Sequence, residues 1–181
     1  MKILWLIFSV IERVYWYVWR NQQMEKFQSY GDNVWISRHC TFVGPLISFG
    51  TDVFVGEYCM FQSSNSKISI GNHVMFGPGV AIHGGDHRTD VVGRYMKDIK
   101  SHEKLESNDK DVVIENDVWV GAEAIILKGV RIGQGSIVGA GSIITKDIPP
   151  YSVVTGCKQQ STRMRWDPET IATHKSMLKI R

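Results

Sequence analysis

Apolar residues recur at every sixth position over much of this chain of 181 residues, and this period restricts the folds that it can adopt. A helix requires apolar spacings of three and four, and an ordinary hairpin sheet alternates at two. A period of six instead predicts short strands joined at corners, with each periodic side chain directed inward. The periodic residues are Val43, Phe49, Val55, Phe61, Ile70, Phe76, Ile82, Ile114, Val120, Ile126, Ile132, Val138 and Ile144.

Glycine directly follows many of these residues, as Gly121 follows Val120. Glycine tolerates the backbone angles and the close approach that a corner requires. Three such edges close one triangular coil, and stacked coils form a prism with a continuous apolar interior. In the segment "DVWVG", Val118 and Val120 are expected to point inward and Trp119 outward. The sequence therefore predicts a mainly β protein built as a parallel β-helix.

The register of the repeat breaks twice. Three extra residues lie between Phe61 and Ile70, and a polar excursion over about residues 83–113 separates Ile82 from Ile114. A solenoid accommodates such an insertion as a loop that leaves one corner, and loops of this kind often carry function. The segment "IHGGDHRTD", with two histidines, stands at the root of this loop.

Three parts of the chain are expected: an apolar helical segment over 1–28, the β-helix with its loop over 29–156, and a helical tail over 157–181. Pro149-Pro150 cannot continue a paired ladder, so the prism is expected to end there. In the tail, Asp167 is a candidate N-cap and Pro168 stands in the first turn of a short helix.

The first segment is strongly apolar but is interrupted by Ser9, Glu12 and Arg13, so no uncharged run is long enough to cross a bilayer. It also lacks the small-residue cleavage site of a signal peptide. We expect a helix that packs on the rest of the protein or on a neighbouring subunit. The alternative is peripheral membrane contact through residues 3–20. The aromatic residues at headgroup level would then be Trp5, Trp16 and Trp19.

Bulk composition excludes one class of partner and indicates a compartment. The net charge is only +3, and no dense basic stripe is present, so nucleic acid is not an expected partner. The three cysteines, Cys40, Cys59 and Cys157, have no disulfide-framework or zinc-knuckle spacing. We therefore expect free thiols and a cytoplasmic location, with the inner face of the membrane as an alternative.

The repeats, the loop rooted at "IHGGDH" and the segment "DVWVGAEAIILKGVRIGQGSIVGAGSIITKDIPPYSVVTG" resemble the left-handed β-helix hexapeptide-repeat acyltransferases. The likeness extends from Tyr30 to Gly156. It is closest to the maltose and galactoside O-acetyltransferases, the xenobiotic acetyltransferases and the sugar O-acetyltransferases of bacterial polysaccharide synthesis. The resemblance implies a homotrimer with acetyl-CoA in the groove between two subunits and a sugar or glycan precursor as acceptor.

The resemblance also implies roles for individual residues, beginning with His87 as the general base. It implies that Trp119 lines the site, and on the substrate side Asp86, Gln62, Asn65 and Arg88 are further candidates. Along the CoA it implies Trp119, Gly121, Ala122, Gly139, Ala140 and Lys146, and Arg163 is a further candidate for the phosphates. The chain departs from the family at Gln62, where maltose-type enzymes have asparagine, and at "GCKQQ", which replaces the usual Asn-Pro-Ala-Lys or Asn-Pro-Ala-Arg. Lys158 is a further candidate for the CoA phosphates.

The residues themselves favour direct acyl transfer. A neutral imidazole suits removal of a hydroxyl proton at physiological pH. Its second nitrogen needs an acceptor, for which Asp86, Asp90 and a backbone carbonyl are candidates. Gly84 and Gly85 would let a backbone amide approach the oxyanion. An acetyl-cysteine intermediate at Cys59 is not favoured, because nothing near it in the sequence suggests activation.

Four alternatives remain open at this point. The acceptor could be an amino sugar, which would make the enzyme an N-acetyltransferase, or a xenobiotic. The same fold also occurs in zinc carbonic anhydrases, for which His73, His83 and His87 would be the ligands. Metal is not expected, because the spacing of these histidines differs from the anhydrase pattern. A non-catalytic scaffold would have no need of the histidine at position 87.

Overall fold

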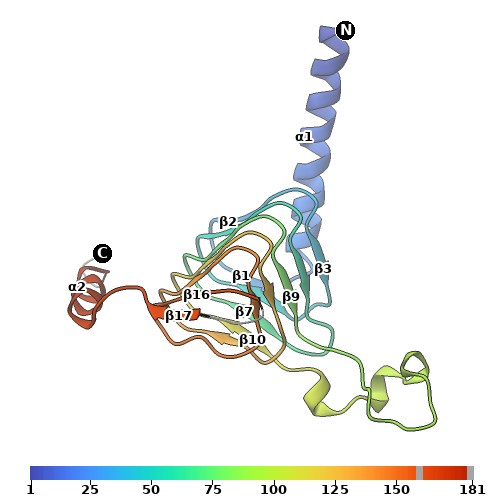
Figure 1. Ribbon diagram of the computed structural model, residues 1–181. Helices are drawn as coiled ribbons and strands as arrows, with labels where there is room; N and C mark the ends of the chain where they lie inside the picture. Colours follow the sequence, from blue (N-terminus) through green and yellow to red (C-terminus); the bar gives the residue numbers. More distant parts are fainter. Residues whose placement is uncertain (158–160, 179–181) are drawn as a thin grey trace.

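The computed structural model describes residues 1–157 and 161–178 of the chain. Three sheets of short strands close around a triangular prism (Figure 1). Sheet A contains β1 (Ser29–Tyr30), β4 (Ile47–Phe49), β7 (Ile68–Ile70), β10 (Val112–Ile114) and β13 (Arg131–Ile132). Sheet C contains β3 (Thr41–Val43), β6 (Met60–Gln62), β9 (Ala81–His83), β12 (Ile125–Ile126) and β15 (Ile143–Ile144).

Sheet B is the largest of the three and receives the end of the chain. Its strands are β2 (Val34–Ile36), β5 (Val53–Val55), β8 (Met75–Phe76), β11 (Trp119–Val120), β14 (Ile137–Val138), β16 (Ser152–Thr155) and β17 (Ser161–Met164). All neighbouring strands in the prism pair in parallel except β16 and β17, which are antiparallel. Because successive strands along the chain pass from one sheet to the next, each residue stacks on its counterpart one coil away.

All but one of the predicted periodic residues lie in the interior of the prism, together with further buried apolar residues such as Ile47, Val74 and Val130. Four of the periodic residues are completely buried in the later coils, namely Ile126, Ile132, Val138 and Ile144. The side chains of their neighbours along the strand face outward. Burying one such aliphatic side chain stabilises the fold by about 1.5 to 3 kcal/mol. This ladder of aliphatic residues makes the prism a rigid support for the loops that extend from its corners.

The prediction for Val43 is wrong, because the first coil is one residue out of phase with the rest. Val43 is 44% exposed, and β3 aligns Phe42 rather than Val43 with the buried Phe61. The rings of Phe42 and Phe61 are 5.6 Å apart. Since side chains alternate along a strand, a shift of one residue turns Val43 to the outside.

The prediction that the prism ends at Pro149-Pro150 is also wrong. Ile148 still forms a parallel bridge with Ile132, and β16 adds a further strand to sheet B. The two prolines occupy the corner between these segments, where no ladder N–H is required of them. The predicted tail helix is confirmed as α2 (Pro168–Leu178), and Asp167 accepts a hydrogen bond of 2.9 Å from the Thr170 amide.

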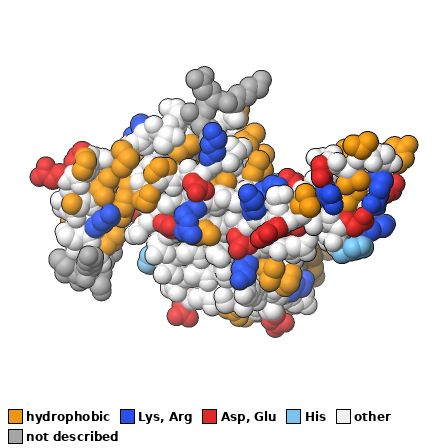
Figure 2. Space-filling view, turned by 90° about the horizontal axis from the view of Figure 1, so that it is seen from below, with side chains coloured by type: hydrophobic (Ala, Val, Ile, Leu, Met, Phe, Trp, Pro, Cys, Tyr) orange, Lys and Arg blue, Asp and Glu red, His pale blue; other side chains and the backbone are white. Residues whose placement is uncertain are grey.

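The polar excursion leaves the prism between β9 and β10, as the sequence predicts (Figure 1). It contains three short 3-10 turns, η1 (Met96–Asp98), η2 (Ser101–Glu103) and η3 (Glu106–Asn108). Arg94 forms an ion pair of 2.6 Å with Glu103 inside it. Acidic and basic side chains are interspersed over the loop, at the right of Figure 2. We call residues 84–111 the extruded loop.

The N-terminal helix α1 (Lys2–Met24) projects away from the prism and contacts it through its C-terminal half, from Glu12 onward (Figure 1). There Trp16 lies 4.5 Å from the ring of His39, and Arg38 forms an ion pair of 2.7 Å with Glu12. The first half of α1 therefore does not pack on the rest of this chain, and its packing on a neighbouring subunit stays a prediction. Within the described residues, no helix combines the length and the apolar character needed to cross a membrane.

Candidate functional site

The extruded loop is closed at its root, because its two ends pair with each other. Gly85 and Asp109 form an antiparallel bridge, and the Asp86 amide donates to the Asn108 carbonyl at 2.9 Å. A Cβ atom on Gly84 or Gly85 would overlap the side chain of Ser66 or Asp109. The two glycines therefore allow this close packing. The Gly84 amide donates to the Gln62 carbonyl at 2.8 Å, so it is already used in the ladder.

Asp86 holds the loop to the prism. Its carboxylate forms an ion pair of 2.7 Å with Lys128 and accepts a hydrogen bond of 3.0 Å from Asn108. Partial burial acts to raise the pKa of Asp86, but the hydrogen bonds from Lys128 and Asn108 outweigh it and hold the pKa below its usual value. Lys128 also donates to the Ser107 carbonyl at 2.6 Å. The carboxylate is thus an ionised structural contact at the start of the loop.

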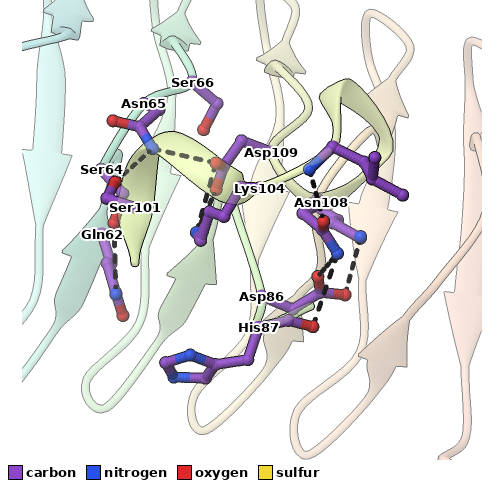
Figure 3. Close-up of polar contacts among 12 residues, drawn as sticks. Gln62, Ser64, Asn65, Ser66, Asp86, His87, Ser101, Lys104, Asn108 and Asp109 are labelled. Atoms are coloured by element: carbon purple, nitrogen blue, oxygen red, sulfur yellow. Dashed lines mark hydrogen bonds and ion pairs between the residues drawn. The ribbon is translucent and has the colours of Figure 1, made fainter. Parts of the chain in front are cut away.

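His87 follows this anchor directly and presents its ring to solvent. In Figure 3 the ring points away from Asp86 and Asn108. Within the described residues, neither ring nitrogen of His87 has a hydrogen-bond partner, whereas its backbone carbonyl accepts from Asn108 at 3.4 Å. The carboxylates expected to orient the ring are engaged elsewhere, Asp86 with Lys128 and Asp90 with Arg88. The backbone of His87 is therefore fixed while its imidazole stays available.

Polar groups at the preceding coil complete the root of the loop (Figure 3). The Asn65 amide nitrogen donates to Asp109 at 3.0 Å, and Asp109 forms an ion pair of 2.8 Å with Lys104. Gln62 donates to the Ser64 hydroxyl at 3.3 Å. Gln62 also lies opposite His83 in the pairing of β6 with β9. Asn65 thus stabilises the loop, and Gln62 stands beside the strand that leads into it.

Arg88 is bound within the loop. Its guanidinium donates to the Asp90 carboxylate at 2.8 Å and to the Glu103 carbonyl at 2.9 Å. The hydrogen bond to Asp90 raises the pKa of Arg88 from its usual value. Arg88 therefore connects the two sides of the loop, whereas it was expected to contact the substrate.

The other predicted site residues lie on different parts of the prism. Trp119 projects from sheet B and is 49% exposed, and Val118 and Val120 on either side are buried as predicted. Gly121 and Gly139 stand at the corner between sheets B and C, each followed by an alanine. A Cβ on Gly121 would lie 2.6 Å from the Ala140 amide nitrogen, so glycine is required there for the coils to stack.

The predicted phosphate contacts are likewise separated from one another. Lys146 is exposed at the corner between sheets C and A, two residues after β15, the position that Lys128 holds after β12. Arg163 lies on β17 opposite Val153 at the end of sheet B. Lys158 lies outside the described residues. One chain alone therefore divides the candidate residues between two corners and two faces of the prism.

Within the described residues, the cysteines and histidines considered for covalent catalysis or zinc binding do not form a cluster with His87. Cys59 is 1% exposed in the prism interior, and its hydrogen bond with Cys40, together with burial, raises the pKa of its thiol. His73 forms an ion pair of 2.9 Å with Asp52 at the corner between sheets A and B. Among the described residues, no group of three or more His, Cys, Asp or Glu side chains could hold a metal ion.

Sequence reasoning missed Lys128 and Asn108, although both hold the root of the loop. The six-residue period contains the signal for Lys128, because Ile126 aligns with Ile82 and Lys128 therefore stacks beside Gly84. For Asn108 the sequence holds no comparable signal. It comes from the irregular return of the loop, and only the closed root brings it to Asp86.

Comparison with known proteins agrees with this architecture. The family described as bacterial transferase hexapeptide (six repeats) matches residues 111–146, which include the strands from β10 to β15. Residues 111–146 belong to the hexapeptide-repeat family. The repeats of this segment are therefore similar to those of a group of bacterial transferases.

This hexapeptide-repeat protein is 38% identical over 141 residues to the galactoside O-acetyltransferase of Lactococcus lactis. The alignment covers 75% of this chain and 64% of that relative. The chain spans less than two thirds of the length of the curated relatives that it matches.

Two solved structures share the fold with this hexapeptide-repeat protein. The maltose O-acetyltransferase of Clostridium difficile 630 superposes with a TM-score of 0.64 at 29% identity, over 79% of this chain and 71% of that one. A galactoside acetyltransferase in complex with coenzyme A superposes with a TM-score of 0.58 at 26% identity, over 81% and 69%.

Proposed function

We propose that the protein is an acetyl-CoA-dependent O-acetyltransferase that transfers the acetyl group to a sugar hydroxyl, with His87 as general base. The observation that carries the proposal is the exposed imidazole of His87, which has no hydrogen-bond partner in the described part of the chain. Its backbone is anchored by Asp86, Asn108 and Lys128. A base needs a fixed position and a free nitrogen, and this arrangement supplies both. The similarity to a galactoside O-acetyltransferase supports the acceptor class.

The reaction needs no covalent enzyme intermediate. His87 takes the proton of the acceptor hydroxyl while the oxygen attacks the thioester carbonyl carbon. The tetrahedral intermediate collapses by breaking the carbon–sulfur bond, and the imidazolium returns the proton to the departing thiolate. General-base assistance of this kind accelerates a reaction by about 10²- to 10⁴-fold. Cys59 is unsuited to be a nucleophile because it is buried and its pKa is raised.

We also propose that the working form is a homotrimer with each site between two prisms. The loop root with His87 and the face with Trp119 belong to different parts of one chain, so a neighbouring copy is needed to bring them together. Sheet B supports an interface, because Phe54, Met75 and Trp119 align in adjacent strands and are each about half exposed. Contiguous apolar surface of this kind is typical of a protein contact.

In this assembly we assign Gly121, Ala122, Gly139 and Ala140 to the pantetheine arm of CoA. The exposed side chains of Lys146 and Arg163 would serve as charge partners of its phosphates. The coenzyme A complex of the related galactoside acetyltransferase supports a CoA site on this fold. The three cysteines are free thiols, which supports the proposed cytoplasmic location.

The test is release of the CoA thiol from acetyl-CoA in the presence of galactosides, maltose, amino sugars and chloramphenicol. We expect release with a sugar hydroxyl and a loss of about 10²-fold or more for His87→Ala. The matched control is His102→Ala, which removes an exposed histidine from the same loop. Equal activity of the two variants would exclude His87 as the base. Release only with amino acceptors or chloramphenicol would exclude the sugar hydroxyl.

The homotrimer is tested separately by sedimentation equilibrium. We expect a trimer for the wild type and monomers for Phe54→Asp, because a charge would be buried in the contact. A monomeric wild type that is fully active would overturn the proposed arrangement of the site.

A further inference from the structure

The surface of α1 is apolar on all sides from Leu4 to Phe8, which is unusual for a helix exposed to water. The consecutive residues Leu4 to Phe8 are between 52% and 73% exposed. Since successive residues of a helix are about 100° apart, five in a row go round the whole circumference. A protein groove covers one face of a helix, so this pattern is better matched by an apolar medium.

The two polar side chains that directly follow this surface, Ser9 and Glu12, have partners within the chain. Glu12 turns to the prism and pairs with Arg38 at 2.7 Å. The Ser9 hydroxyl donates to the Leu6 carbonyl at 2.8 Å, within the helix. A hydroxyl that bonds to its own helix can enter hydrocarbon without leaving an unsatisfied group. The segment from Leu4 to Ile11 therefore meets the condition for burial in lipid.

A cationic, aromatic cavity of about 450 Å³ lies where α1 meets β2. Its charged lining residues are Arg13, Arg20, Arg38 and one acidic residue, Glu57, so basic groups predominate. Arg20 lies over the ring of Trp35 at 4.7 Å. Arg38 is paired with Glu12, whereas Arg13 has no ion-pair partner within residues 1–157 and 161–178. The positive charge at the base of an apolar helix is complementary to anionic lipid headgroups.

We propose that α1 anchors the protein in one leaflet of a bilayer that contains anionic phospholipid. Leu4 to Ile11 would enter the hydrocarbon, and the arginines of the cavity would contact lipid phosphates. Eight helical residues span about 12 Å, less than half of the roughly 30 Å hydrocarbon layer. Tyr15, Trp16, Tyr17 and Trp19 then lie at the depth where aromatic side chains are enriched. This proposal does not depend on the transferase activity.

The experiment is co-sedimentation of the full chain with vesicles of phosphatidylcholine alone, or of equal parts phosphatidylcholine and phosphatidylglycerol. We expect binding to the mixed vesicles to fall at least about tenfold in Phe8→Glu, because the charge enters hydrocarbon. Arg13→Gln should lower it by about fivefold, the contribution of one basic residue near an anionic surface. Val92→Glu is the matched control, since it places the same charge on an exposed apolar residue of the extruded loop.

Circular dichroism and sedimentation equilibrium on the same variants show whether they fold and whether their oligomeric state changes. Absence of wild-type binding to the mixed vesicles would overturn the proposal. A change in oligomeric state of Phe8→Glu without vesicle binding by the wild type would assign α1 to a contact between copies instead. Equal binding to both vesicle types would overturn the role of the arginines, and equal binding by Phe8→Glu and Val92→Glu would overturn that of the helix.

Discussion

Lys128 Nζ lies 2.7 Å from Asp86 Oδ2, although the whole extruded loop separates the two residues along the chain. The contact joins the first residues of the loop to the next coil of the prism, and His87 follows Asp86 immediately. The same ammonium group donates to the carbonyl of Ser107 on the returning side. One lysine therefore fixes both sides of the loop root.

We expect Lys128→Met to lower kcat/KM by about tenfold to a hundredfold, because a base displaced by a fraction of an ångström no longer meets the hydroxyl. The variant should keep its thermal midpoint within a few degrees, since the prism core is unchanged. Steady-state kinetics and amide hydrogen exchange of residues 86–88 test this. Lys97→Met, at an exposed lysine in η1, is the control. Unchanged kinetics in Lys128→Met would show that the clamp does not position His87.

The phase shift in the first coil predicts opposite effects for two adjacent residues. Phe42→Ala should destabilise the protein by about 2 kcal/mol or more, because its ring packs on Phe61 and leaves a cavity. Val43→Ala should change the stability by less than about 0.5 kcal/mol, as is usual for exposed sites. Denaturant unfolding measures both. A larger loss from Val43→Ala would contradict the register described above.

Stacking of the coils makes Gly121 sensitive to any side chain. We expect Gly121→Ala to destabilise the protein by about 1 to 3 kcal/mol, because the new methyl group would meet the Ala140 backbone at 2.6 Å. Thr145→Ala, an exposed position on another corner, should have no comparable effect. Thermal unfolding distinguishes them, and equal midpoints for both variants would mean that the coils can separate at little cost.

The extruded loop should loosen in acid through Glu103. The hydrogen bond from the Arg94 guanidinium, reinforced by that from the Lys100 amide, lowers the pKa of Glu103 from 4.5 to about 2. A carboxyl whose pKa is lower in the folded state stabilises the fold above pH 4.5. This contribution is lost as the pH falls towards about 2.

Hydrogen exchange of residues 94–104, corrected for the intrinsic pH dependence of exchange, measures this loss. Protection should be constant above pH 4.5 and decline below it. Glu103→Gln should show lower protection at neutral pH and no further decline of this kind. A wild-type loop whose protection is independent of pH down to 2 would rule out the ion pair as its stabiliser.

Most of the prism could be predicted from the sequence because its structure is local and periodic. Each coil repeats the same pattern, in which an apolar residue points inward and a tight corner follows. The orientation of the periodic residues from Phe49 to Ile144 can therefore be predicted from their spacing. The orientation of Val43 in the first coil was predicted wrongly. One additional residue before β4 changes the phase of the repeat without changing the kind of residue present. The prolines after Ile148 were wrongly predicted to end the prism. A corner tolerates a residue without an N–H group, whereas a paired strand does not.

The candidate site was predictable only in part. The position of His87 at the root of the loop follows from the sequence, because it lies only five residues after Ile82, the last periodic residue before the insertion. Its surroundings depend on contacts between residues far apart in the chain, such as Asp86 with Lys128 and Asn65 with Asp109. Likewise, the hydropathy of α1 is a property of the sequence, but its projection from the prism is not. Whether an apolar side chain is buried depends on what folds against it, and only the tertiary structure decided that the first half of α1 has no such neighbour within the described chain.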